Sequence, residues 1–80
     1  MKARIDVILK DGVLDPQGKA IHQALRHLGF EKVREVRQGK VIEIDLDETD
    51  KNRALSGLKT MSEKLLANQV IENYRITLQD

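Results

Sequence analysis

Two short runs of residues decide how this chain can fold: Asp15-Pro16-Gln17-Gly18-Lys19-Ala20 and Leu65-Leu66-Ala67-Asn68-Gln69-Val70-Ile71-Glu72-Asn73-Tyr74. Each run lies at a boundary between predicted secondary-structure elements, where backbone geometry limits the choice of residue. Neither run contains a nucleophile, an acid–base pair or a set of metal ligands. The most specific parts of the sequence therefore indicate shape and contact rather than catalysis.

The first run predicts the start of a helix. Asp15 is a favourable N-cap residue, and Pro16 stands at the first helical position, where its missing N–H costs nothing. At the other end, Gly29 is expected in the left-handed conformation, and Phe30 is expected to fold back onto Leu25. The predicted buried stripe of this helix has amphipathic spacing and consists of Ile21, Ala24, Leu25 and Leu28.

Gly18 is the residue of this run that helix formation does not explain. A glycine weakens the first turn of a helix, so its presence needs another reason. Without a side chain, the position permits close approach by another group. That group is either a loop of the same protein or a partner molecule, and the sequence leaves the two open.

Strand patterns account for much of the remaining chain. Residues 3–9, 40–46 and 74–78 alternate apolar and polar side chains with a two-residue period. Residues 33–38 favour β structure but carry several charges, which is typical of an edge strand. Gln38-Gly39 is predicted to make the tight reversal that follows. A hairpin turn explains Gly39-Lys40 better than a phosphate-binding loop, whose spacing the neighbouring residues lack.

A second, longer helix is predicted after Asp47-Glu48-Thr49-Asp50, which supplies caps and negative charge for its N-terminus. Gly57 lies inside the helix, where it costs about 1 kcal/mol relative to alanine. Asn68 is expected to end the helix in the left-handed conformation. The predicted buried stripe consists of Ala54, Leu58, Met61 and Leu65, broadened by Leu55 and Leu66.

The order of these elements is β-α-β-β-α-β, which predicts an α+β fold of the ferredoxin-like type over a single domain, residues 1–80. Its four-stranded antiparallel sheet would carry both helices on one face. The opposite face would hold Ile8 and Val41 among polar residues, which makes these two the candidate self-association face. A chain of 80 residues without cysteine is also expected to gain stability from homo-oligomerisation.

Composition argues against several function classes. Lys and Arg number 14 against 13 Asp and Glu, and proteins that bind nucleic acid usually carry a clear basic excess. The sequence has no apolar run of membrane-spanning length and no signal peptide, so we expect a cytoplasmic protein without membrane contact.

Catalytic and metal sites find no specific support in the sequence. His22 and His27 lie about 140° apart around a helix, so they are expected to be solvated rather than to share a ligand site. The acidic residues between Asp45 and Asp50 lack the glycine and terminal glutamate of a calcium loop. Ser56 and Ser62 have no His–Asp partners nearby. We therefore predict no catalytic, cofactor or metal residues in this chain.

Taken in order, the motifs resemble those of the PurS family, the small subunit of phosphoribosylformylglycinamidine synthase. The resemblance covers essentially the whole chain. Its marks are Val13-Leu14-Asp15-Pro16-Gln17-Gly18, Leu28-Gly29-Phe30 with Val33, Gly39-Lys40, Leu65-Leu66-Ala67-Asn68, and Val70-Ile71-Glu72 with Tyr74. The chain departs from the family at Gln69, where proline is usual, and the turn there loses a constraint on φ.

The resemblance implies a bridging subunit without an active site of its own. It would join a glutaminase (PurQ) and a synthetase (PurL) in de novo purine synthesis and support ammonia transfer between them. ATP and Mg²⁺ would bind only to the synthetase subunit. The candidate partner-contact or family-motif residues are Asp15, Pro16, Gly18, Gly39, Lys40, Asn68 and Tyr74.

Two other classes of function stay open at this point. A regulatory domain of the ACT type has the same predicted fold and also dimerises, and an amino-acid ligand would stabilise it. A minimal stand-alone enzyme has the least support and would turn over substrate as an isolated chain.

Overall fold

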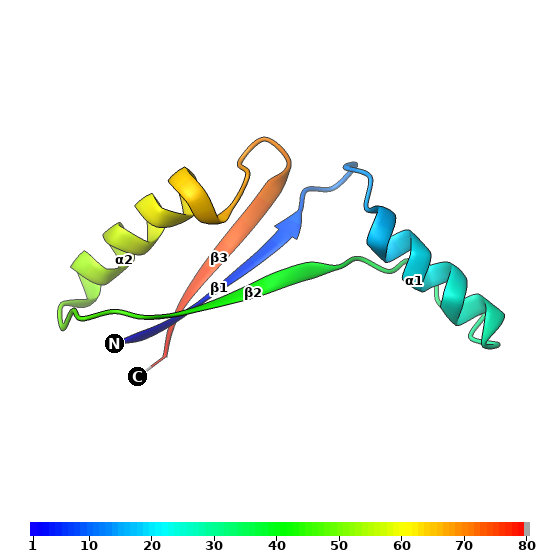
Figure 1. Cartoon of the computed structure of the whole chain (residues 1–80), viewed down its shortest axis with the longest axis horizontal. Helices are drawn as coiled ribbons and strands as arrows, with labels where there is room; N and C mark the ends of the chain where they lie inside the picture. The colour runs from blue at the N-terminus through cyan, green and yellow to red at the C-terminus, as the bar shows by residue number, and fades with distance from the viewer. Residues whose placement is uncertain (80) are drawn as a thin grey trace.

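The computed structural model describes residues 1–79 and contains one antiparallel sheet, two α-helices and a single π-helical turn, η1 (Figure 1). The three strands lie in the order β2-β1-β3, so β1 is central and both of its neighbours run antiparallel to it. The elements are β1 (Lys2–Leu9), α1 (Pro16–His27), β2 (Gly39–Asp45), α2 (Lys51–Met61), η1 (Ser62–Leu66) and β3 (Glu72–Gln79).

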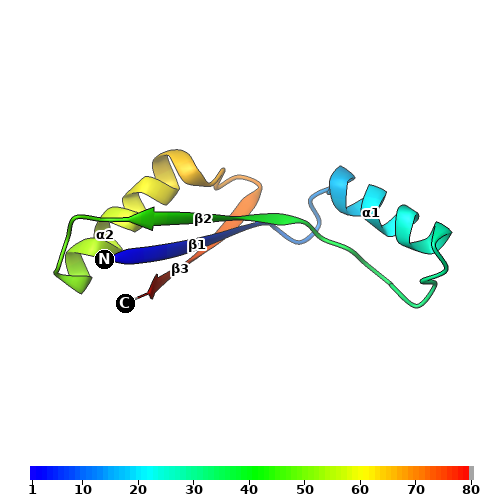
Figure 2. The same ribbon diagram turned by 60° about the horizontal axis from the view of Figure 1, so that its bottom comes forward.

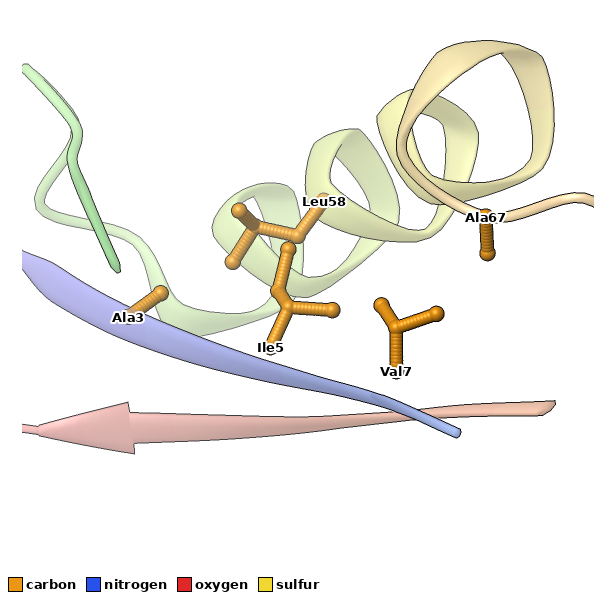
Figure 3. Close-up of a cluster of buried hydrophobic side chains, with 5 residues drawn as sticks. All are labelled: Ala3, Ile5, Val7, Leu58 and Ala67. Carbon is orange, nitrogen blue, oxygen red and sulfur yellow. The ribbon is translucent and has the colours of Figure 1, made fainter. Parts of the chain in front are cut away.

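The core forms between the inner face of the sheet and α2. Alternation along β1 directs Ala3, Ile5 and Val7 to this face, where all three are buried. Figure 3 shows Ile5 and Leu58 of α2 pointing toward one another, with Ala67 covering the far end of the strand. The partly buried apolar residues around this cluster are Ile42, Ile44, Leu46, Leu66, Tyr74, Ile76 and Leu78.

The prediction of a fourth strand was wrong. Within residues 1–79, residues 33–38 form no strand and no hairpin with β2. Their polar groups bond elsewhere: the Gln38 N–H donates to the Asp15 carboxylate, and the Arg37 side chain donates to backbone carbonyls at the end of β1. Gly39 therefore makes no reversal and begins β2 directly.

The prediction that both helices cover one face of the sheet was also wrong. Helix α2 lies over the sheet, whereas α1 projects beyond its end (Figures 1 and 2). The radius of gyration is 16.1 Å, against about 11.6 Å for a compact domain of this length. The stripe predicted to be buried on α1 is consequently open, with Ile21 40% and Leu28 72% exposed.

The backbone at the end of α1 agrees with the prediction of a left-handed Gly29. Gly29 has a φ of +98°, and its N–H donates to the Arg26 carbonyl at 3.0 Å. The Phe30 N–H donates to the Leu25 carbonyl, also at 3.0 Å. These two bonds define the Schellman ending, while the side chain of Phe30 is 58% exposed.

The second helix changes form before it ends. Ala54 and Leu58 are buried as predicted, but the next buried residue is Ser62, and Leu65 is 83% exposed. The Ala67 N–H donates to the Ser62 carbonyl at 2.9 Å, a bond across five residues that defines η1. The Ser62 hydroxyl donates to the Leu58 carbonyl at 2.8 Å, which satisfies it inside the core.

Asn68 does not end this helix in the left-handed conformation. Among residues 1–79, positive φ angles occur only at glycines. No helix in the same range is long and apolar enough to cross a membrane.

We predict that Gly29→Val destabilises the protein by about 1–2 kcal/mol, because a β-branched residue is strained at positive φ. A Cβ at Gly29 would meet no atom within 4 Å, so the cost arises from the backbone alone. Urea unfolding followed by circular dichroism measures it.

Gly57→Ala is the matched control for this measurement. A Cβ there would meet only the Met61 Cε, at 4.0 Å. The substitution should therefore stabilise the protein by up to about 1 kcal/mol. Unchanged stability of Gly29→Val would contradict the strain at Gly29.

Candidate functional site

The carboxylate of Asp15 connects two segments that are far apart in the sequence. Its Oδ1 accepts the Gly18 N–H at 2.9 Å and so caps α1. Its Oδ2 accepts the Gln38 N–H at 2.8 Å, just before β2 begins. The hydrogen bonds from these backbone amides, that of Gln38 foremost, lower the pKa of Asp15 below its usual 3.8.

Gly18 explains how the two segments can lie so close together. It is the buried residue of α1. A Cβ at this position would collide with the Val36 carbonyl and lie 2.6 Å from the Asp15 Oδ2. The group that approaches Gly18 therefore belongs to the protein's own chain, which decides between the two explanations left open by the sequence.

Arg37 fastens the same segment to the end of β1. Its Nη1 donates to the Asp11 Oδ1 at 2.8 Å, and its Nη2 donates to the carbonyls of Leu9 and Lys10. The guanidinium group suits this task because its donors form a rigid, planar fork. We call Asp15, Gly18, Val36, Arg37 and Gln38 the joint.

His22 was predicted to be solvated, and that prediction was wrong. The side chain is half-buried, and its Nε2 lies 2.7 Å from the Val33 carbonyl. Because a carbonyl oxygen only accepts, the Nε2 carries the proton and donates it. Sequence reasoning also missed the role of Arg37 in holding residues 33–38 to the end of β1. The one signal for this role was the position of Arg37 in a charged run that is too polar for a buried strand.

Four of the predicted site residues meet beside the joint. Asp15, Pro16, Gly39 and Lys40 line one open hollow of about 430 Å³. Pro16 occupies the first turn of α1 as predicted. Gly39 pairs with Ile8 of β1, and a Cβ on it would collide with the Val7 carbonyl.

Asn68 lies in the turn between η1 and β3, which the Lys10 N–H joins to the end of β1 by donating to the Ile71 carbonyl at 2.8 Å. Its Oδ1 accepts the Val70 N–H at 3.0 Å, and its N–H donates to the Glu72 Oε1 at 2.7 Å. Its carbonyl accepts the Glu72 N–H at 2.7 Å. Asn68 therefore shapes this turn through its own hydrogen bonds, with Val70 82% exposed at the surface.

Tyr74 supports the same region from β3. Its hydroxyl donates to the Glu63 Oε2 at 2.9 Å. Partial burial, followed by this contact with an anion, raises the pKa of the Tyr74 hydroxyl. Tyr74 and Asn68 thus hold a turn flanked by the exposed side chains of Leu65 and Val70.

The outer face of the sheet contains the two aliphatic residues proposed for self-association. Ile8 is 42% and Val41 52% exposed, and the register places Val41 opposite Asp6, diagonally next to Ile8. Asp6 accepts from Arg4 at 2.9 Å and from Arg75 at 3.5 Å. The hydrogen bond from Arg4 is the main reason why the pKa of Asp6 is lowered.

Among residues 1–79, no group of three or more histidine, cysteine or acidic side chains is placed to hold a metal ion. The turn around Asn68 and the tip of α1 instead present formed loops and exposed apolar side chains (Figure 1). This arrangement suits contact with other proteins.

Comparison with known proteins identifies the family. The family model for PurS, described as phosphoribosylformylglycinamidine (FGAM) synthase, matches residues 2–80. The chain belongs to the PurS family. The PurS subunit of Bacillus subtilis is 42% identical over 79 residues, which cover 99% of this chain and 93% of the relative. That of Archaeoglobus fulgidus is 42% identical over the full length of both chains.

Solved structures of PurS proteins have the same fold. Bacillus subtilis PurS superimposes with a TM-score of 0.86 over 99% of this chain and 98% of that one, at 42% identity. A PurLQS structure from Thermotoga maritima contains a chain with a TM-score of 0.85 and 34% identity, over 95% of this chain and 93% of that chain. The projecting α1 is thus part of a fold that the family shares.

We predict that the stabilising effect of Asp15 depends on pH. Its folded-state pKa is lowered, so its contribution is complete above the unfolded value of about 3.8 and is lost as the pH falls through the folded value. Urea midpoints of the wild type and Asp15→Asn should differ near neutral pH and converge in acid. A difference that stays constant with pH would contradict the role of the Asp15 charge.

Proposed function

We propose that this chain is the PurS subunit of a phosphoribosylformylglycinamidine synthase, where it joins a PurQ glutaminase to a PurL synthetase and supports ammonia transfer. The family match over residues 2–80 carries the proposal. The related chain in the PurLQS structure supports the choice of partners. ATP and Mg²⁺ would bind to the synthetase subunit, and the complex would work in the cytoplasm.

The shape of the molecule suits a bridging role. Its principal extents are 49, 27 and 14 Å, so a single chain reaches far for its size. The turn around Asn68 and the tip of α1 lie at separate places on this frame (Figure 1). Two partners can therefore contact the same chain without competing for one surface.

We also infer that a second copy of the chain covers α1. The accessible surface is 6305 Å² for a chain of 9.1 kDa. A compact monomer of this mass exposes about 4,900 Å². The excess of about 1,400 Å² exceeds the roughly 800 Å² that each partner buries in a standard interface.

A second copy is the occupant that the sequence pattern favours. The predicted ferredoxin-like order would pack α1 on the sheet, but the joint directs this helix away from its own sheet. The inner side chains of β2, Ile42 and Ile44, are only partly buried. A helix from another copy would supply the cover that the chain's own α1 does not give.

The ACT-type alternative finds no support in the family comparison. It would also require a ligand-dependent increase in stability. Thermal unfolding with single amino acids provides a direct check of this alternative.

Reconstitution with PurL and PurQ tests the bridging function. We expect glutamine-dependent synthesis to require this chain, because the chain couples the glutaminase to the synthetase. Synthesis from added ammonium salt by PurL should persist without it. Equal dependence of both activities on this chain would contradict a purely coupling role.

The double substitution Asn68→Ala/Tyr74→Ala should weaken glutamine-dependent synthesis in that complex and leave the ammonium-dependent activity in place. The reason is that both side chains hold the turn that presents Leu65 and Val70. Lys59→Ala, on the exposed side of α2, is the matched control. Undiminished glutamine-dependent activity would remove this turn from the interface.

Self-association should depend on the apolar stripe of α1. Burying a leucine contributes about 1.5–3 kcal/mol, so Leu28→Ser should raise the dissociation constant at least about tenfold. Gln23→Ser, a polar exposed position on the same helix, should leave it unchanged. Light scattering across micromolar concentrations measures the mass, and a wild-type monomer at every concentration would contradict self-association.

A further inference from the structure

We propose that the joint is a rigid positioning device that fixes the direction of α1 relative to the sheet before any partner binds. The usefulness of this direction rests on the proposed function, in which α1 contacts a second copy. The fixed direction itself follows from the bonds within one chain.

Helix α1 is connected to the rest of the molecule by two chain segments (Figures 1 and 2), and the joint brings the two into contact. Residues 10–15 lead into the helix, and residues 28–38 return from it to β2. If these two connections were not bonded to each other, the direction of α1 relative to the sheet could vary. The Asp15 carboxylate ties them together, because each of its oxygens accepts an N–H from a different segment.

Arg37 provides a second tie between the same parts of the chain. Arg37, in the returning segment, donates to carbonyls of Leu9 and Lys10 and to the Asp11 carboxylate. These acceptors lie at the end of β1 and directly after it, so the bond links the returning segment to the central strand. A lysine would provide a single flexible point charge in place of this planar fork.

At Gly18, α1 and the returning segment are in direct contact, because glycine has no side chain to separate them. The Val36 carbonyl occupies the position where any other residue would have a Cβ. The side chains of Gln17 and Gln38 add a hydrogen bond of 2.8 Å beside this contact. His22 extends the attachment one turn further, through the Val33 carbonyl.

The joint therefore gives a function to the Asp15-Pro16-Gln17-Gly18 motif that helix initiation alone does not. The motif begins the helix and also sets its direction. A partner that binds the exposed stripe of α1 then meets a preorganised surface. Binding does not have to include the free-energy cost of fixing the direction of α1.

Distance measurements between two spin labels test this proposal. The chain has no cysteine, so labels can be placed at His27→Cys on α1 and Glu43→Cys on β2, both exposed positions. Excess unlabelled protein limits the signal to pairs within one chain. We expect a single narrow distance distribution in the wild-type background.

Asp15→Asn and Arg37→Lys should each broaden this distribution at least about twofold, because each loses a tie between segments. Asp50→Asn is the matched control: among residues 1–79, the Asp50 side chain caps α2 by accepting the N–H groups of Asn52 and Arg53 and accepts none from a distant segment. It should leave the width of the distribution unchanged, because asparagine caps a helix about as well as aspartate. Circular dichroism confirms that each variant is folded.

Hydrogen exchange at the Gln38 amide gives an independent measurement. Its exchange should accelerate at least about tenfold in Asp15→Asn and remain unchanged in Asp50→Asn. Unchanged distance widths together with an unchanged Gln38 exchange rate would overturn the proposal. Failure of the proposed function would be visible separately, as a wild-type chain that shows the narrow distribution but does not restore glutamine-dependent synthesis.

Discussion

The shape of this protein depends on one shared carboxylate. Asp15 divides its two oxygens between the first turn of α1 and the amide that precedes β2. Both donors are backbone N–H groups, so the bonds fix the course of the chain as well as a side chain. With Gly18 admitting the Val36 carbonyl, α1 and the returning segment form one unit that extends away from the sheet.

Comparison of the two helix caps shows what local sequence determines. Asp15 was predicted as an N-cap, and the run from Asp47 to Asp50 was predicted to supply the cap of the second helix. In the structure Asp15 and Asp50 both accept N–H groups from the first turn of their helix. Asp50 uses one oxygen for both donors, whereas Asp15 keeps its second oxygen for Gln38, 23 residues away. Capping follows from neighbouring residues, but the second acceptor depends on a contact that local patterns do not encode.

The same limit explains the other differences between prediction and structure. Gly29 and the alternating strands were predictable because their causes lie within a few residues. The stripe on α1 was recognised as apolar, but amphipathic spacing indicates only that a face needs cover, not which molecule provides it. In α2, Ser62 takes the buried position one turn after Leu58, and the wider π-helical turn that follows brings Ala67 rather than Leu65 back to the core.

The predicted site residues show the same contrast between what neighbouring residues determine and what depends on distant contacts. The predicted motif residues lie at structural boundaries, as expected, yet the contacts of Asp15, Gly18, Asn68 and Tyr74 are first of all internal. Residues of this kind shape the surfaces that they flank. The side chains offered to a partner are their exposed apolar neighbours, such as Leu65 and Val70, which carry no motif signal because their chemistry is ordinary.

The small core links stability to assembly. Its buried apolar residues are Ala3, Ile5, Val7, Ala54, Leu58 and Ala67. Three of these are alanines, so the buried apolar surface is small for a chain that must offset the entropy of folding. Under the proposed association, burial of α1 by a second copy would add apolar area that the single chain lacks. Because such an association would stabilise the folded state by mass action, the proposal implies that the stability of this protein increases with its own concentration.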